Sequence, residues 1–175
     1  PTTDIYLSHY QAAPLLRQRE EGAVQVRTST DLNLTVALAT LTDEGVVLED
    51  GRVIRWEFVQ AAAENDSACY RIDDRWMDKV QTYSRMPDRV YTLYPTPGAP
   101  TMLVSGVPMH RIKGTNPFQD TLTKVRAIAP ITGDVLDTCT GLGYTACQAS
   151  RSARRVVTIE LDPAAHAIAH LNPWS

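Results

Sequence analysis

The stretch that decides the fold reads Val135-Leu136-Asp137-Thr138-Cys139-Thr140-Gly141-Leu142-Gly143-Tyr144-Thr145-Ala146. Gly141, Gly143 and Ala146 satisfy the pattern G-x-G-x-x-[GA] directly after a short apolar run. Glycines at such a turn let the backbone bend sharply and let a ligand approach the main chain. The pattern therefore predicts a strand at 134–137, a glycine-rich loop, and a helix at 143–152.

The flanking segments complete the unit around this loop. An apolar run predicts a second strand at 155–161, and helices are expected at 120–128 and, with a proline in its first turn, at 163–171. Strand, glycine loop, helix and strand in this order form the opening βαβ unit of a parallel, doubly wound sheet. The fold class predicted here is therefore α/β, with a Rossmann-like sheet.

The upstream part of the chain has the pattern of a small, mainly antiparallel β domain. A helix at 8–21 should end at Gly22, and Asp50-Gly51 between two apolar runs is a hairpin signal. Dense prolines and glycines at 94–117 indicate a connecting segment. The predicted organisation, α+β overall, is a helix plus β-rich domain at 1–104, a connecting segment at 105–118, and the start of a Rossmann-like domain at 119–175.

Two acidic residues bear on which ligand suits the glycine loop. Glu160 ends the second strand, about 20 residues after the loop, where a carboxylate can accept hydrogen bonds from ribose hydroxyls. Asp137 ends the first strand, where it would repel the pyrophosphate of a dinucleotide. S-adenosylmethionine has no phosphate and carries an ammonium and a sulfonium group, so Asp137 favours it over NAD. The structural alternative for Asp137 is that it caps the loop.

The sequence also resembles a known protein family. Asp137-x-x-x-Gly141-x-Gly143 followed by Glu160 is similar to motif I and the next acidic position of class I methyltransferases. The stretches 100–106, 109–114, 135–145 and 171–175 resemble a family of predicted, mostly archaeal methyltransferases with a β-rich N-terminal extension. This resemblance implies S-adenosylmethionine as the cofactor. The cofactor-binding residues expected are Asp137, Thr138, Cys139, Thr140, Gly141, Gly143, Tyr144, Thr145, Glu160, Leu161 and Asp162, and after them His110, Arg111 and Lys113.

The chain departs from that family in the extent of its sheet. Class I sheets are seven-stranded, and only the first two strands are predicted within residues 1–175. A later loop that resembles Asp-Pro-Pro in this family, of a kind that elsewhere orients an amine for methylation, is missing. We therefore expect a truncated form of the catalytic domain that is inactive alone, with catalytic residues beyond Ser175. The incomplete sheet predicts self-association or a complementing polypeptide.

The expected function is that of an S-adenosylmethionine-dependent methyltransferase, a transferase whose acceptor is unidentified, an amine nitrogen being one candidate. Two alternatives stay open at this point. One is an aminopropyltransferase-like enzyme, which uses a related fold and a decarboxylated cofactor. The other is a non-catalytic binding or assembly module that retains a remnant of the cofactor fold.

Charge, hydropathy and cysteine content bear on the partners, the membrane association and the compartment of the protein. A net charge of -3 does not indicate a nucleic-acid partner, and no apolar run reaches the about 20 residues of a membrane span. The N-terminus has no signal-peptide pattern, and three cysteines without C-x-x-C spacing fit a reducing, cytoplasmic protein. His166 and His170 have a metal-compatible spacing, but no third ligand follows at a recognisable distance, so no metal site is predicted.

Overall fold

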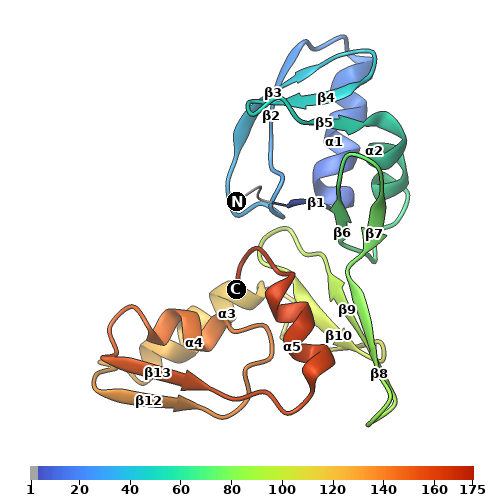
Figure 1. Ribbon diagram of the computed structural model, residues 1–175. Coiled ribbons are helices and arrows are strands. Elements are labelled where there is room, and N and C mark those ends of the chain that lie inside the picture. Colours follow the sequence, from blue (N-terminus) through green and yellow to red (C-terminus); the bar gives the residue numbers. More distant parts are fainter. Residues whose placement is uncertain (1–3) are drawn as a thin grey trace. The chain divides into compact units, whose positions relative to one another are not determined.

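The computed structural model describes residues 4–175 and divides into two compact units, one ending at Val80 and one running from Gln81 to Ser175 (Figure 1). Both units mix helices with strands, and most strand pairs are antiparallel. The unit boundary lies at 80/81, whereas the sequence predicted a first domain ending at 104. The reason is that residues 81–104 form strands that pair with one another and pack on the last helix of the chain.

The first unit contains two antiparallel sheets and two helices. One sheet has the strand order β1-β6-β7 and the other β2-β3-β4-β5. The elements are β1 (Ile5–Leu7), α1 (His9–Glu20), β2 (Gln25–Thr28), β3 (Ala37–Leu41), β4 (Gly45–Leu48), β5 (Val53–Arg55), α2 (Trp56–Ala63), β6 (Tyr70–Ile72) and β7 (Met77–Lys79).

Local chemistry explains the ends of these elements. Ser8 and Gln11 form a capping box at the start of α1, and Gly22 follows its end with a φ of +75°. The hairpin predicted at Asp50-Gly51 is confirmed, because β4 and β5 pair antiparallel around it. Helix α2 was not predicted, since it begins directly after β5 and its first residue, Trp56, continues the strand pattern.

The second unit opens with a four-stranded antiparallel sheet of order β11-β10-β9-β8. Two of its strands, β10 and β11, lie in the stretch where the sequence predicted connecting structure. The elements of this unit are β8 (Gln81–Ser84), β9 (Arg89–Tyr94), β10 (Thr101–Val104), β11 (Val107–Pro108), α3 (Pro117–Ala127), β12 (Asp134–Asp137), α4 (Tyr144–Ala149), β13 (Arg155–Thr158) and α5 (Pro163–His170).

The strand–loop–helix–strand unit predicted around the glycine loop is present. Strands β12 and β13 are parallel, in a register that runs from Asp134 opposite Arg155 to Asp137 opposite Thr158. Helix α4 is shorter than predicted, and β13 ends at Thr158 rather than at 161. Beyond Thr158, the Ile159 N–H donates to the Asp137 carbonyl at 3.0 Å, and the Ile159 carbonyl accepts from the Thr140 N–H at 2.9 Å. Within residues 4–175 this parallel sheet has two strands.

Helix α5 joins the two parts of the second unit. It packs on β8 and β9, and the Thr82 hydroxyl donates to the Ala164 carbonyl at 3.1 Å. The Tyr91 hydroxyl of β9 donates to the carboxylate of Asp162, which caps α5, at 2.8 Å. These contacts bring the antiparallel sheet next to the glycine loop (Figure 1).

Candidate functional site

The glycine loop between β12 and α4 is a tight turn that requires its glycines. Gly141 and Gly143 have φ values of +52° and +76°, in the left-handed region that favours glycine. The Gly143 N–H closes the turn by donating to the Thr140 carbonyl at 2.7 Å. A Cβ at Gly141 would lie 2.8 Å from the sulfur of Met109, so a side chain there would force Met109 to move.

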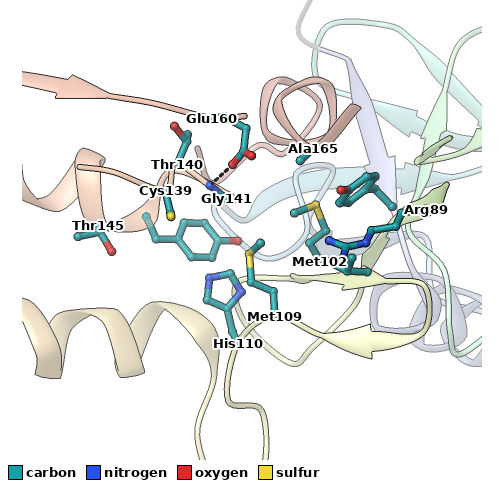
Figure 2. Close-up of a pocket in the computed structure, with 13 residues that line it drawn as sticks. Arg89, Met102, Met109, His110, Cys139, Thr140, Gly141, Thr145, Glu160 and Ala165 are labelled. Carbon is teal, nitrogen blue, oxygen red and sulfur yellow. Dashed lines mark hydrogen bonds between the residues drawn. The ribbon is translucent and has the colours of Figure 1, made fainter. Parts of the chain in front are cut away.

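A cavity of about 370 Å³ opens beside this loop (Figure 2). This size is in the range of small-molecule sites in proteins. One wall comes from the loop and α4, a second from the residues after β13, and a third from the antiparallel sheet and the segment that follows β11. The lining residues are Arg89, Tyr91, Met102, Val104, Met109, His110, Cys139, Thr140, Gly141, Tyr144, Thr145, Glu160 and Ala165.

Glu160 is held against the loop at one end of this cavity. One carboxylate oxygen accepts from the Gly141 N–H at 3.0 Å (Figure 2). The other accepts from the Asp162 N–H at 3.2 Å. A carboxylate offers about four lone-pair sites, so two backbone bonds leave acceptor capacity for ligand hydroxyls. The structure thus places Glu160, the acidic residue expected to bind ribose hydroxyls, against the glycine loop.

Asp137 occupies a different position from Glu160 and is not part of the cavity lining. Its carboxylate accepts from the Thr158 hydroxyl at 2.9 Å, and this hydroxyl lies 2.6 Å from that of Thr140. The three side chains tie the carboxyl ends of β12 and β13 to the start of the loop. This geometry matches the loop-capping alternative for Asp137.

The other predicted contact residues divide into two groups. Cys139, Thr140, Tyr144, Thr145 and His110 line the cavity together with Gly141 and Glu160. The rest lie outside the lining: Thr138, Gly143, Leu161, Asp162, Arg111 and Lys113.

Asp162 and Leu161, both predicted as cofactor contacts, have different surroundings. Asp162 caps α5, accepting from the Ala164 N–H at 2.9 Å and from the Tyr91 hydroxyl. Burial acts to raise the pKa of Asp162, but the hydrogen bonds from Ala164, Tyr91 and Ser84 and the charge of Arg89 outweigh it and lower that pKa. The side chain of Leu161 is 95% exposed.

Two aromatic side chains fix the middle of the cavity wall. The Tyr144 hydroxyl donates to the Pro100 carbonyl at 2.8 Å and accepts from the Asn172 amide at 3.0 Å. The His110 ring packs against the Tyr144 ring, with 5.3 Å between centroids. Burial, followed by the charge of Lys124, lowers the pKa of His110, against a smaller opposite effect of Asp120.

Sequence reasoning missed the residues that the antiparallel sheet contributes to the lining. Arg89, Tyr91, Met102 and Val104 come from β9 and β10, which the sequence assigned to a separate domain, and Ala165 lies on α5. The signal that pointed closest to them was the stretch 100–106 of the family resemblance, which contains Met102 and Val104. The pairing of β9 with β10 places these side chains in one sheet, and the packing of α5 and the Tyr144–Pro100 hydrogen bond hold that sheet beside the glycine loop.

The two histidines with metal-compatible spacing lie on an exposed side of α5. The rings of His166 and His170 pack edge to face with 4.4 Å between centroids. Within residues 4–175, no three side chains of the metal-binding types gather into a cluster.

Comparison with known proteins gives one informative match. No family model matches the chain. An uncharacterized protein of Methanocaldococcus jannaschii is 37% identical over 123 residues, which are 70% of this chain and 41% of that protein. The match thus spans less than half of the relative's length. In the described part of the chain, no helix has the length and apolar character needed to cross a membrane.

Proposed function

We propose that the chain is part of a cytoplasmic S-adenosylmethionine-dependent methyltransferase, and that the cavity beside the glycine loop is its cofactor site. The observation that carries this proposal is the juxtaposition of the Gly141 backbone and the Glu160 carboxylate. The two meet at the carboxyl ends of two parallel strands, where open α/β sheets bind their ligands. Under this proposal β12, α4 and β13 are the opening part of a Rossmann-like sheet.

The carboxylate of Asp137 at the end of β12 supports a cationic ligand over a dinucleotide. Glu160 presents a carboxylate at the loop, Asp137 lies outside the lining at the end of β12, and Arg89 lines the cavity from β9. A pyrophosphate over this loop would lie near the carboxylate of Asp137, whereas S-adenosylmethionine has no phosphate and would bring its ammonium and sulfonium groups. The ribose hydroxyls would donate to the remaining lone pairs of Glu160.

The chemistry of the proposed reaction asks little of the protein beyond alignment. A nucleophile on the acceptor, an amine nitrogen being one candidate, attacks the methyl carbon, the carbon–sulfur bond breaks, and its electron pair stays on sulfur. Holding the two reactants in line supplies much of the acceleration in such a step. The residues that line the cavity identify neither the methyl acceptor nor the catalytic residues.

We further propose that the parallel strand pair is covered in the working protein, either by self-association or by a complementing polypeptide. Leu136, Val157 and Ile159 are 60%, 39% and 51% exposed. Parallel strands are normally buried on both faces, and an open strand edge invites pairing with another chain. The exposed apolar side chains support such a covering partner.

Calorimetric titration with S-adenosylmethionine tests the cofactor proposal. Glu160→Ala removes charge-assisted hydrogen bonds, so the dissociation constant should rise about ten- to a hundredfold for each bond lost. Glu49→Gln, which removes an exposed carboxylate in the turn between β4 and β5, is the control and should bind normally. The assignment is wrong if Glu160→Ala binds the cofactor as tightly as the unmodified chain.

Asp137→Asn separates the two roles considered for Asp137. If its carboxylate attracts the ammonium group, the variant should bind S-adenosylmethionine more weakly and NAD more tightly. If it only organises the loop through Thr158, affinity for both ligands should change in the same direction. Tighter binding of NAD than of S-adenosylmethionine by the unmodified chain would overturn the choice of ligand.

A further inference from the structure

His110 and Thr101 form a hydrogen-bonded pair at the cavity wall. The Thr101 hydroxyl oxygen accepts from the backbone N–H of His110 at 3.2 Å and lies 3.0 Å from its Nδ1. Thr101 is fully buried in strand β10, so its hydroxyl hydrogen is shielded from bulk solvent. A buried donor of this kind is almost always paired within the protein.

The position of that hydrogen fixes the tautomer of the histidine. A backbone N–H only donates, so it cannot receive the Thr101 hydrogen. Among residues 4–175, His110 Nδ1 is the one acceptor within reach of the Thr101 hydroxyl. Donation from the hydroxyl to Nδ1 satisfies this buried hydrogen, and it requires the tautomer whose proton is on Nε2.

We propose that Thr101 holds His110 as a neutral imidazole whose Nε2–H donates a hydrogen bond to the cofactor in the cavity. The identity of the ligand rests on the proposed function, but the tautomer assigned to His110 does not. The partner atom must carry a free lone pair, as the carboxylate, ribose and adenine groups of S-adenosylmethionine do. Because Nε2 is already protonated, His110 does not remove a proton from the methyl acceptor.

Several features keep the ring uncharged and in place. Protonation would put a hydrogen on Nδ1, opposite the Thr101 hydroxyl hydrogen, and would leave that buried hydrogen without an acceptor in the described chain. Burial and Lys124 on α3 oppose the charge, and Asp120 on α3 favours it to a smaller extent. From the other walls, Tyr144 packs on the ring, and Glu160 and Arg89 line the same cavity. A neutral ring also avoids repelling the cofactor's sulfonium group.

Nuclear magnetic resonance tests the tautomer without any ligand. A long-range proton–nitrogen spectrum at pH 7 should show His110 with a protonated Nε2 and an unprotonated Nδ1. Thr101→Ser keeps the hydroxyl and should keep this pattern, whereas the near-isosteric Thr101→Val should give a mixture of tautomers. A protonated Nδ1 in the unmodified chain would overturn the proposal.

Calorimetry then tests the contact with the ligand, using S-adenosylhomocysteine and 5′-methylthioadenosine as probes. His110→Phe keeps a ring but has no donor, and should weaken S-adenosylhomocysteine about three- to tenfold. His110→Gln restores an N–H near Nε2 and should recover most of this loss. A loss with both probes places the bond on the nucleoside, and a loss confined to S-adenosylhomocysteine places it on the amino-acid carboxylate.

The two proposals fail in different ways. If neither probe binds the unmodified chain while the spectrum shows Nε2 protonated, the cofactor assignment fails and the tautomer stands. If S-adenosylhomocysteine binds the unmodified chain and His110→Phe equally well, the cofactor assignment stands and the hydrogen bond from His110 is refuted.

Discussion

Two sheets of this protein have similar apolar strands but very different burial. In the first unit, Val46 and Ile54 of the β2–β5 sheet are fully buried, because α1 and α2 supply a common core in the same unit. In the second unit, Leu136 of β12 and Val157 of β13 keep 60% and 39% of their surface exposed. Apolar strands need other elements packed against them to become buried. Of these two sheets, only the one in the first unit is packed in this way within residues 4–175.

The largest effect expected is in the closed core of the first unit. Ile54→Ala removes a fully buried side chain and should lower the free energy of unfolding by about 2–5 kcal/mol. Leu38→Ala, on the half-exposed side of β3, is the control and should change stability by less than about 0.5 kcal/mol. Urea denaturation followed by tryptophan fluorescence measures both. Equal losses for the two variants would show that this core is not closed as described.

A smaller effect is expected where the cavity wall is held together in the second unit. Tyr144→Phe removes the hydroxyl that bonds Pro100 and Asn172. The Pro100 carbonyl and the Asn172 amide then each lose one hydrogen bond. The cost should be about 1–3 kcal/mol. Hydrogen exchange of the α4 backbone amides should speed up accordingly.

Tyr83→Phe is the matched control for this variant. It also removes a bonded hydroxyl, but on an exposed ring, and should leave the exchange of α4 unchanged. Slow α4 exchange in Tyr144→Phe would mean that the hydroxyl does not anchor this wall.

Local sequence signals predicted the elements on which the proposed site is built. The strand at 134–137 has the predicted bounds, because a short apolar run precedes a turn whose positive φ values favour glycine. The helix at 163–171 was found to within one residue, since Asp162 and Pro163 form a cap and a first turn. Both signals are contained within a few neighbouring residues.

The rest of the cavity depends on contacts between distant residues, which no local pattern encodes. The prolines and glycines at 94–117 indicated a connecting segment, yet Thr101–Val104 pairs with Tyr91–Tyr94 to form the opposite wall. The position of Asp137 was predicted, but its partner was not, because Thr158 joins it only through the register of β12 and β13. His110 was identified as a candidate without any sign of its bond to Thr101.

The pH dependence of stability should distinguish the cavity wall from an exposed helix face. The pKa of His110 is lowered in the folded chain, so between that pKa and about 6.5 the unfolded state binds more protons. The stability contributed by His110 is therefore complete above about pH 6.5 and is lost as the pH falls through the folded pKa. His110→Gln should flatten this part of the stability–pH curve, measured by urea denaturation of the second unit. His166→Gln, on the exposed side of α5, is the control, and an equal flattening by it would contradict the assignment.

The smallest effect is expected at the exposed strand pair, and it is the most informative for the comparison. Leu136→Ala on the chain by itself should change stability by less than about 0.5 kcal/mol, because 60% of this side chain is already in water. If a second copy or a complementing polypeptide covers β12, the same change removes a buried leucine and should cost about 2–5 kcal/mol in the assembled state. Sedimentation over a range of concentrations identifies which state is measured. A large cost at dilutions where the chain is monomeric would show that Leu136 is buried within the chain itself, and the contrast between the two sheets would then be wrong.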